Sequence, residues 1–213
     1  MNKLKSLPGL AALVLLMIST SGLNAELRPF PHKESDLPVD AGVEWGVLEN
    51  GLRWVIFPWS EPPERVSLRL LVEAGSLQET DRQKGLAHLI EHMAFNGTRN
   101  FSAGEMVEYF QRLGMAFGPD TNAHTWWRET VYKLELPDND PQLLHDGLRL
   151  LRDYADGMLL EEEEIEKEKG VVLSEYRDRD SAAFKAYKDS LQFSLPDSLI
   201  SRRVVIGDRD VIR

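Results

Sequence analysis

Residues 85–98, GLAHLIEHMAFNGT, form the most informative stretch of the sequence. Their apolar side chains recur every three or four positions, the spacing of one face of an α-helix, at Leu86, Leu89, Ile90 and Met93. Gly97 follows this pattern directly, and glycine is the residue that most often ends a helix. The stretch therefore predicts a helix over residues 85–96 that ends at Gly97.

Strand patterns lie on both sides of this helix. Before it, residues 66–72 alternate between core-facing apolar and mostly polar side chains, which indicates a half-buried strand that ends at Gly75. Further upstream, two apolar stretches within residues 46–57 flank Asn50-Gly51, the strongest short signal for a β-hairpin. Two more short strands are predicted after the helix, at residues 121–125 and 130–136.

Three further helices are predicted between and after these strands. Ser102 and Glu105 make a capping box that begins the first of them, and Pro141 is typical of the first position of the second. The predicted helices cover residues 102–113, residues 141–158, and a long acidic stretch from residue 161 to beyond residue 175. This order of elements predicts an α+β fold, in which helices pack on one face of an antiparallel sheet.

The composition excludes several classes of protein. The chain has 213 residues and a net charge of −10, and its hydrophobic content of 42% excludes a wholly disordered chain. It contains no cysteine, which excludes disulfide scaffolds, cysteine-ligated metals and a thiol nucleophile. Because a chain this acidic is repelled by phosphate backbones, we expect no nucleic-acid partner.

The N-terminus has the pattern of a secretory signal peptide. Lys3 and Lys5 precede a short apolar run over residues 10–18, and small and polar residues follow as far as Ala25. We expect a signal peptide over residues 1–25, an extended lead-in over residues 26–44 and a periplasmic or secreted protein. The apolar run is shorter than the roughly 20 residues of a membrane span, so we expect no stable span once the signal is cleaved. An uncleaved N-terminal anchor is the alternative.

The predicted helix over residues 85–96 carries a candidate metal site. His88 and His92 are four positions apart, which places both side chains on one helix face, one turn apart, where two neutral imidazoles can bind one metal ion. Glu91 projects beside the pair, where its carboxylate could take a proton from a zinc-activated water. A catalytic zinc needs a third protein ligand, and His32, His124, His145 and the carboxylates are candidates. The alternative is an exposed polar stripe of the helix without a metal.

Three sequence blocks together resemble one protein family. They are HLIEHMAFNGT at residues 88–98, NAHTWWRETVY at residues 122–132 and EKEKGVVLSEY at residues 166–176. They are similar, in the same order, to the N-terminal domain of the pitrilysin, insulinase and mitochondrial-processing-peptidase family of zinc peptidases. The resemblance covers roughly residues 45–210, and the sequence of these segments is most similar to that of the bacterial periplasmic members.

The resemblance implies roles for individual residues. Glu175 would be the third ligand of one Zn²⁺ ion beside His88 and His92, Glu168 would support the site from outside, and Glu91 would be the catalytic base. Asn122 and Ala123 would bind a peptide substrate, which pairs with an edge strand at this point. For Trp126 and Trp127, a substrate subsite and a sheet cover both stay open, and Thr130 and Tyr132 look structural.

The resemblance also implies a missing part. Enzymes of this family resemble a clamshell of two halves, and the second half supplies an Arg and a Tyr to the substrate site. Residues 45–213 are thus expected to be a metallopeptidase N-terminal domain, truncated before the remaining domains, that binds zinc but hydrolyses little peptide without a C-terminal half. Two alternatives are a non-catalytic scaffold and a zinc-binding module of the same fold.

Overall fold

A computed structural model describes residues 30–116 and 118–213. The predicted signal peptide and the first residues of the predicted lead-in lie outside the described residues. The chain divides into two compact units, Met1–Ser60 and Glu61–Arg213. Among the described residues, no helix combines the length and the apolar composition that crossing a bilayer requires.

The N-terminal unit contains a β-hairpin. Strands β1 (Glu44–Val47) and β2 (Arg53–Ile56) pair antiparallel, with Val47 opposite Arg53. Gly51 in the connecting turn has a φ of 87°, a conformation that glycine adopts without strain, so the hairpin predicted at Asn50-Gly51 is confirmed. The described part of the lead-in includes one 3₁₀ turn, Pro31–Lys33.

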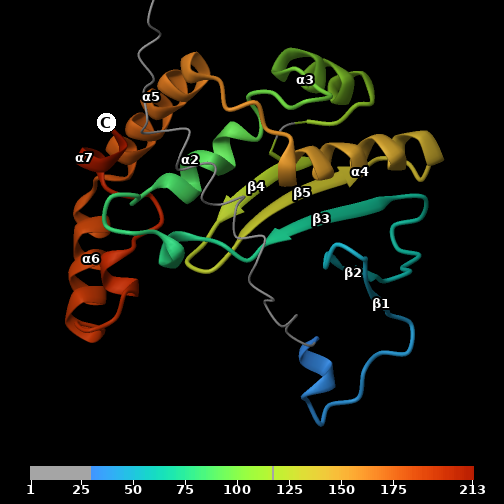
Figure 1. The fold of residues 1–213 in the computed structure, drawn as a ribbon, viewed down its shortest axis with the longest axis horizontal. Coiled ribbons are helices and arrows are strands. Elements are labelled where there is room, and N and C mark those ends of the chain that lie inside the picture. Colours follow the sequence, from blue (N-terminus) through green and yellow to red (C-terminus); the bar gives the residue numbers. More distant parts are fainter. Residues whose placement is uncertain (1–29, 117) are drawn as a thin grey trace, which may run out of the picture. The chain divides into compact units, whose positions relative to one another are not determined.

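A three-stranded antiparallel sheet is the centre of the second unit (Figure 1). The strand order is β3 (Val66–Val72), β5 (Thr130–Leu136) and β4 (Thr121–Thr125). Residue Val66 pairs with Leu136 in one ladder, and Thr125 pairs with Thr130 in the other. All three strands were predicted, and the structure confirms the α+β class.

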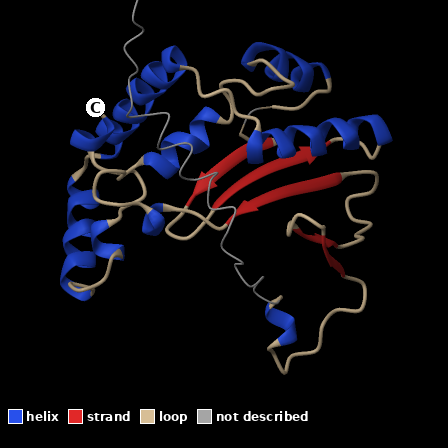
Figure 2. Ribbon diagram, in the orientation of Figure 1, coloured by secondary structure: helices blue, strands red, loops and turns tan. Residues whose placement is uncertain are grey.

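Helices α2 (Leu86–Met93) and α4 (Pro141–Asp156) lie on one face of this sheet (Figure 2). Along β5, every second side chain from Thr130 to Leu136 is buried, which is the period of a strand with one covered face. Helix α4 (Pro141–Asp156) packs on that face so closely that a Cβ on Gly147 would lie 2.9 Å from Leu68. Helix α2 (Leu86–Met93) contacts β4 and β5, and Thr125 and Thr130 on the same face are buried beneath it.

The remaining helices follow the predictions less evenly. The capping box of Ser102 and Glu105 begins α3 (Ala103–Arg112) as predicted, and the acidic stretch forms α5 (Glu162–Arg179). The predicted end of α2 at Asn96 is wrong, because the helix ends at Met93. The N–H groups of Phe95 and Asn96 bond to carbonyls three residues back instead of four, and Gly97 follows with a φ of 113°. The elements that follow α5 were not predicted; they are α6 (Ala182–Ser194), a 3₁₀ turn (Ile200–Arg202) and α7 (Arg209–Ile212).

The N-terminal end of α2 is held by distant parts of the chain. The Glu79 carboxylate accepts hydrogen bonds from the backbone N–H groups of Gly85 and Ala87, and a carboxylate is favourable at a helix N-terminus. Arg203, which is buried, donates its Nε–H to the Glu79 carbonyl. The segment after Arg203 then brings Gly207 against Gly85, so the C-terminal part of the unit fixes where α2 begins.

We expect Gly207→Ala to lower the free energy of unfolding by about 3 kcal/mol, because the new methyl overpacks a contact between two backbones. Its Cβ would lie 2.4 Å from the Gly85 Cα, and Gly207 has a φ of 83°, which is strained for any other residue. Gly170→Ala is the matched control, since Gly170 lies in α5 with open space around it and alanine there should add about 0.5–1 kcal/mol. Urea unfolding measures both, and equal stability of the two variants would contradict this packing.

Candidate metal centre

Helix α2 holds the two predicted histidines side by side. The Nε2 atoms of His88 and His92 lie 3.2 Å apart, and their rings meet at an interplanar angle of 80°. Burial, together with the smaller effects of the neighbouring charges of His92 and Arg179, lowers the pKa of His88 to about 4. His88 is therefore a neutral imidazole near pH 7, the form that binds a metal ion.

Helix α5 brings a carboxylate to the same point. Helices α2 and α5 are in contact, and Oε2 of Glu175 lies 3.5 Å from the His88 Nε2 and 3.6 Å from the His92 Nε2. The three ligand atoms all lie within 4.8 Å of one another, and the other oxygen of Glu175 pairs with Arg179. Two imidazole nitrogens and one carboxylate oxygen that face each other are a donor set used by catalytic zinc sites, so these residues fit the ion.

The other candidate ligands lie elsewhere. In the part of the chain that the structure describes, the group of possible metal ligands consists of His88, His92 and Glu175. The three histidines left open from the motif alone, His32, His124 and His145, do not belong to it.

Glu168 contacts His92 at Nδ1, the ring nitrogen that does not face Glu175. Its Oε1 lies 2.8 Å from the His92 Nδ1, on the opposite side of the ring from the Nε2 that faces Glu175. A carboxylate at this nitrogen favours the tautomer with the proton on Nδ1, which leaves the Nε2 lone pair free for a metal. The second oxygen of Glu168 accepts a hydrogen bond from Asn96, a contact that the sequence motifs did not indicate.

Glu91 lies in a buried position beside these ligands. It is 8% exposed, and its Oε2 accepts a hydrogen bond of 2.6 Å from the Thr125 hydroxyl. Burial raises the pKa of Glu91, which the Thr125 bond partly offsets. The Thr130 hydroxyl lies 3.3 Å from that of Thr125 and donates to the Ala74 carbonyl. Thr125 was not among the predicted site residues, although strand alternation indicates that it lies on the buried side of β4.

Asn122 and Ala123 lie on β4, the strand at the end of the described three-stranded sheet. The exposed side chain of Asn122 donates to the Gly118 carbonyl and accepts a hydrogen bond of 2.8 Å from the Ala123 N–H. The Asn122 side chain therefore already accepts the hydrogen bond that the Ala123 N–H can donate.

The pairing pattern gives the direction of the Ala123 backbone. The Glu135 N–H donates to the Asp120 carbonyl, and the Trp126 N–H donates to the Glu129 carbonyl. Asp120 and Trp126 are both even-numbered positions on the β4 side of the ladder. Because hydrogen-bonded pairs alternate along an antiparallel ladder, the N–H and C=O groups of Ala123 point away from β5. These two backbone groups face the open edge of the sheet.

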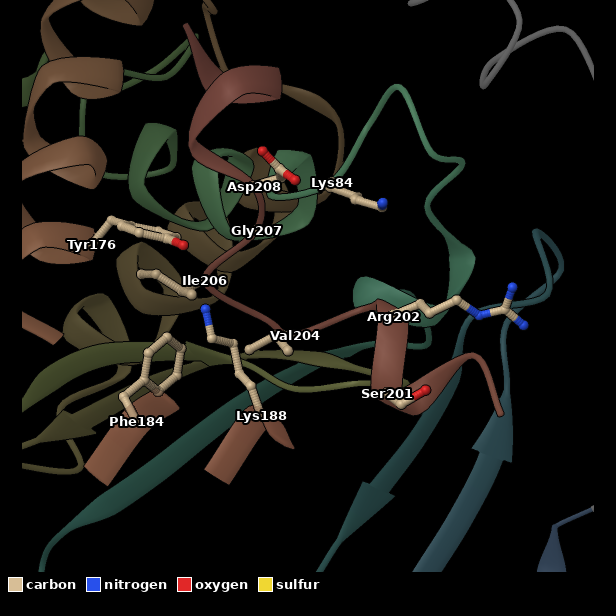
Figure 3. A pocket seen from close by; sticks show the side chains of 10 residues that line it. All are labelled: Lys84, Tyr176, Phe184, Lys188, Ser201, Arg202, Val204, Ile206, Gly207 and Asp208. Atoms are coloured by element: carbon tan, nitrogen blue, oxygen red, sulfur yellow. The ribbon is translucent and has the colours of Figure 1, made fainter. Parts of the chain in front are cut away.

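A separate small cavity lies between residues of α5, of α6 and of the segment that follows Arg203 (Figure 3). Its volume is about 150 Å³, and Tyr176 from α5 and Lys188 from α6 extend toward Ile206 and Gly207 there. None of the candidate ligands lines it. The cavity therefore contributes no group to the metal centre.

The chain is similar in sequence to several known proteins. A profile of the insulinase family, peptidase family M16, matches residues 55–194. The chain is 34% identical over 210 residues to a probable zinc protease PqqL from Haemophilus influenzae, and this match covers 99% of the chain and 22% of the relative. It is 35% identical over 176 residues to the probable zinc protease PqqL from Escherichia coli, covering 83% of the chain and 19% of the relative.

A solved structure has the same fold. The crystal structure of the periplasmic protease PqqL from Escherichia coli matches with a TM-score of 0.78 and 35% identity, over 83% of this chain and 19% of that one. The chain thus spans about a fifth of the length of the curated relatives it matches.

Proposed function

Because the chain belongs to the insulinase family, peptidase family M16, we propose that it is the metal-binding part of a zinc-dependent metalloendopeptidase. The observation that carries this proposal is the convergence of His88, His92 and Glu175 from two helices on one point. The relatives named as zinc proteases support the same chemistry.

Each side chain has a distinct part in the proposed reaction. His88, His92 and Glu175 would hold one Zn²⁺ ion, and Glu168 would keep the His92 ring oriented. When bound, zinc supplies Lewis-acid chemistry that polarises a peptide carbonyl and activates water. Glu91 accepts the proton of the attacking water and later returns it to the leaving amine. Its raised pKa suits a carboxyl that must hold a proton between these two steps.

The proposed substrate is an extended peptide that pairs with β4. The open edge at Ala123 offers one N–H and one C=O group, which is how an added strand is bound. Because the Asn122 side chain covers the Ala123 N–H, it would have to turn away when a peptide binds, and it could then contact the peptide itself.

We propose that efficient hydrolysis needs a C-terminal half, since the relatives are about five times longer than the matched region. By analogy with the periplasmic protease PqqL of Escherichia coli, residues 1–25 would be a signal peptide that directs the protein to the periplasm. Residues 45–213 would be the metallopeptidase N-terminal domain.

Metal analysis of the purified chain, followed by a peptide assay, tests the function. We expect one zinc per chain, little hydrolysis of a fluorogenic peptide by the chain alone, and hydrolysis when a C-terminal half is added. A chain without stoichiometric zinc would instead be a non-catalytic scaffold. Bound zinc with no hydrolysis in the presence of the C-terminal half would indicate a zinc-binding module.

A further inference from the structure

The side chain of Asn96 lies behind the metal centre, outside the residues given a role above. Its Nδ2 donates a hydrogen bond of 2.7 Å to Oε2 of Glu168, while Oε1 of the same carboxylate lies 2.8 Å from the His92 Nδ1. Both oxygens of Glu168 are therefore engaged, one by the ring and one by the amide. The Glu168 side chain is 15% exposed, so little water is available to replace either partner.

We propose that Asn96 is a positioning residue of the zinc site, which fixes the plane of the Glu168 carboxylate and through it the ring of His92. This inference rests on the proposed zinc function. An amide nitrogen only donates, so it can satisfy Oε2 of Glu168 without competing for the proton on the His92 Nδ1. The Nε2 of His92 is then left unprotonated toward His88 and Glu175, as a metal ligand requires.

The two histidines differ in this respect. His92 is fixed by the Glu168–Asn96 pair, whereas the Nδ1 of His88 is buried and has no hydrogen-bond partner among residues 30–116 and 118–213. His88 is held mainly by packing, since it is 7% exposed. Of the two ligand rings, His92 is therefore the one that a hydrogen bond at Nδ1 orients. We expect loss of Asn96 to weaken zinc binding.

Asn96 is suited to this role by its place in the chain. It follows the end of α2 at Met93, and its backbone N–H donates to the Met93 carbonyl. Among the described residues, its side chain makes one further hydrogen-bonding contact, a long one of 3.9 Å to the Met93 sulfur. Removal of the amide therefore leaves one oxygen of Glu168 without its donor and disturbs little else of the fold.

Asn100 offers a matched control from the same loop. Its side-chain amide also donates to a carboxylate, that of Asp153, which is fully buried and also accepts from Thr98. That network joins the loop to α4, so it stabilises the fold without touching a metal ligand. Asn100→Ala should reduce stability but leave the zinc affinity within about threefold of the wild type.

The experiment compares zinc affinity of the wild-type chain, Asn96→Ala, Asn96→Asp and Asn100→Ala by competition with a chromophoric chelator. We expect Asn96→Ala to bind zinc about tenfold more weakly, the lower end of the 10–100-fold range for groups that orient a metal ligand. Asn96→Asp, which sets a carboxylate against Glu168, should bind more weakly still. The absorption spectrum of the Co²⁺-substituted chain should change in both Asn96 variants and not in Asn100→Ala.

The outcomes separate this inference from the proposed function. Zinc binding by Asn96→Ala within twofold of the wild type, or an equal loss in Asn100→Ala, would overturn the role of Asn96 alone. A wild-type chain that binds no zinc would overturn the proposed function and the role of Asn96 with it. Thermal unfolding of the metal-free variants shows that each one is folded before its affinity is compared.

Discussion

Replacing Glu91 by glutamine is expected to reduce peptide hydrolysis by at least about a hundredfold while one zinc stays bound, because general-base catalysis typically contributes 10²–10⁴-fold. Glutamine has the same shape and can still accept the Thr125 hydrogen bond, but it cannot take a proton from water. Since burial raises the pKa of Glu91, the neutral amide also avoids the cost of a buried charge, and the variant should unfold no more easily than the wild type. Hydrolysis is measured with the C-terminal half present.

Glu163→Gln is the control for this substitution. Glu163 lies in the first turn of α5 with its side chain 82% exposed, so its charge is lost without any change at the metal centre. Its hydrolysis should equal that of the wild type. Retained hydrolysis in Glu91→Gln, with zinc still bound, would remove Glu91 from the proposed reaction.

The parts of the fold that depend on nearby residues could be predicted from the sequence. The pairing of His88 with His92 follows from a spacing of four residues on a helix, and the strand at Thr130–Leu136 follows from simple alternation. The hairpin turn at Gly51 is equally local. In each case the residues that decide the conformation lie within one or two turns or one strand.

The contacts that complete the site join distant residues, and no local pattern indicates them. Thr125 reaches Glu91 over 34 positions, and Asn96 reaches Glu168 over 72. Arg203 reaches back over 124 positions to Glu79 at the start of α2. Such partners depend on how helices and strands pack, which local patterns in a single sequence do not indicate.

The choice between the two glutamates of α5 shows the same limit. Glu168 and Glu175 are seven residues apart, about two helical turns, so spacing alone places both on one face and makes them equivalent. The family resemblance ranked Glu175 first as the ligand. In the structure, Glu175 faces the two Nε2 atoms, whereas Glu168 faces the Nδ1 of one ring.

This difference predicts the largest effects on metal binding. Glu175→Gln should weaken zinc binding by more than about a hundredfold, because it replaces a charged ligand atom by a poorly donating amide. Glu168→Gln should weaken it by about 10–100-fold, the range for groups that orient a ligand without touching the metal. Zinc at a hundred times its Kd stabilises the fold by about 2.7 kcal/mol, so the rise in Tm on adding zinc should nearly disappear in Glu175→Gln.

The order of the two effects decides which carboxylate is the ligand. Both variants remove one charge from the same face of α5, so a merely electrostatic contribution would weaken zinc binding about equally. A ligand and a supporting group differ by whether a metal–oxygen bond is lost, and only the first should abolish the zinc-dependent rise in Tm. A larger loss in Glu168→Gln than in Glu175→Gln would exchange the two roles, and it would show that the side chains of α5 rearrange around the ion when it binds.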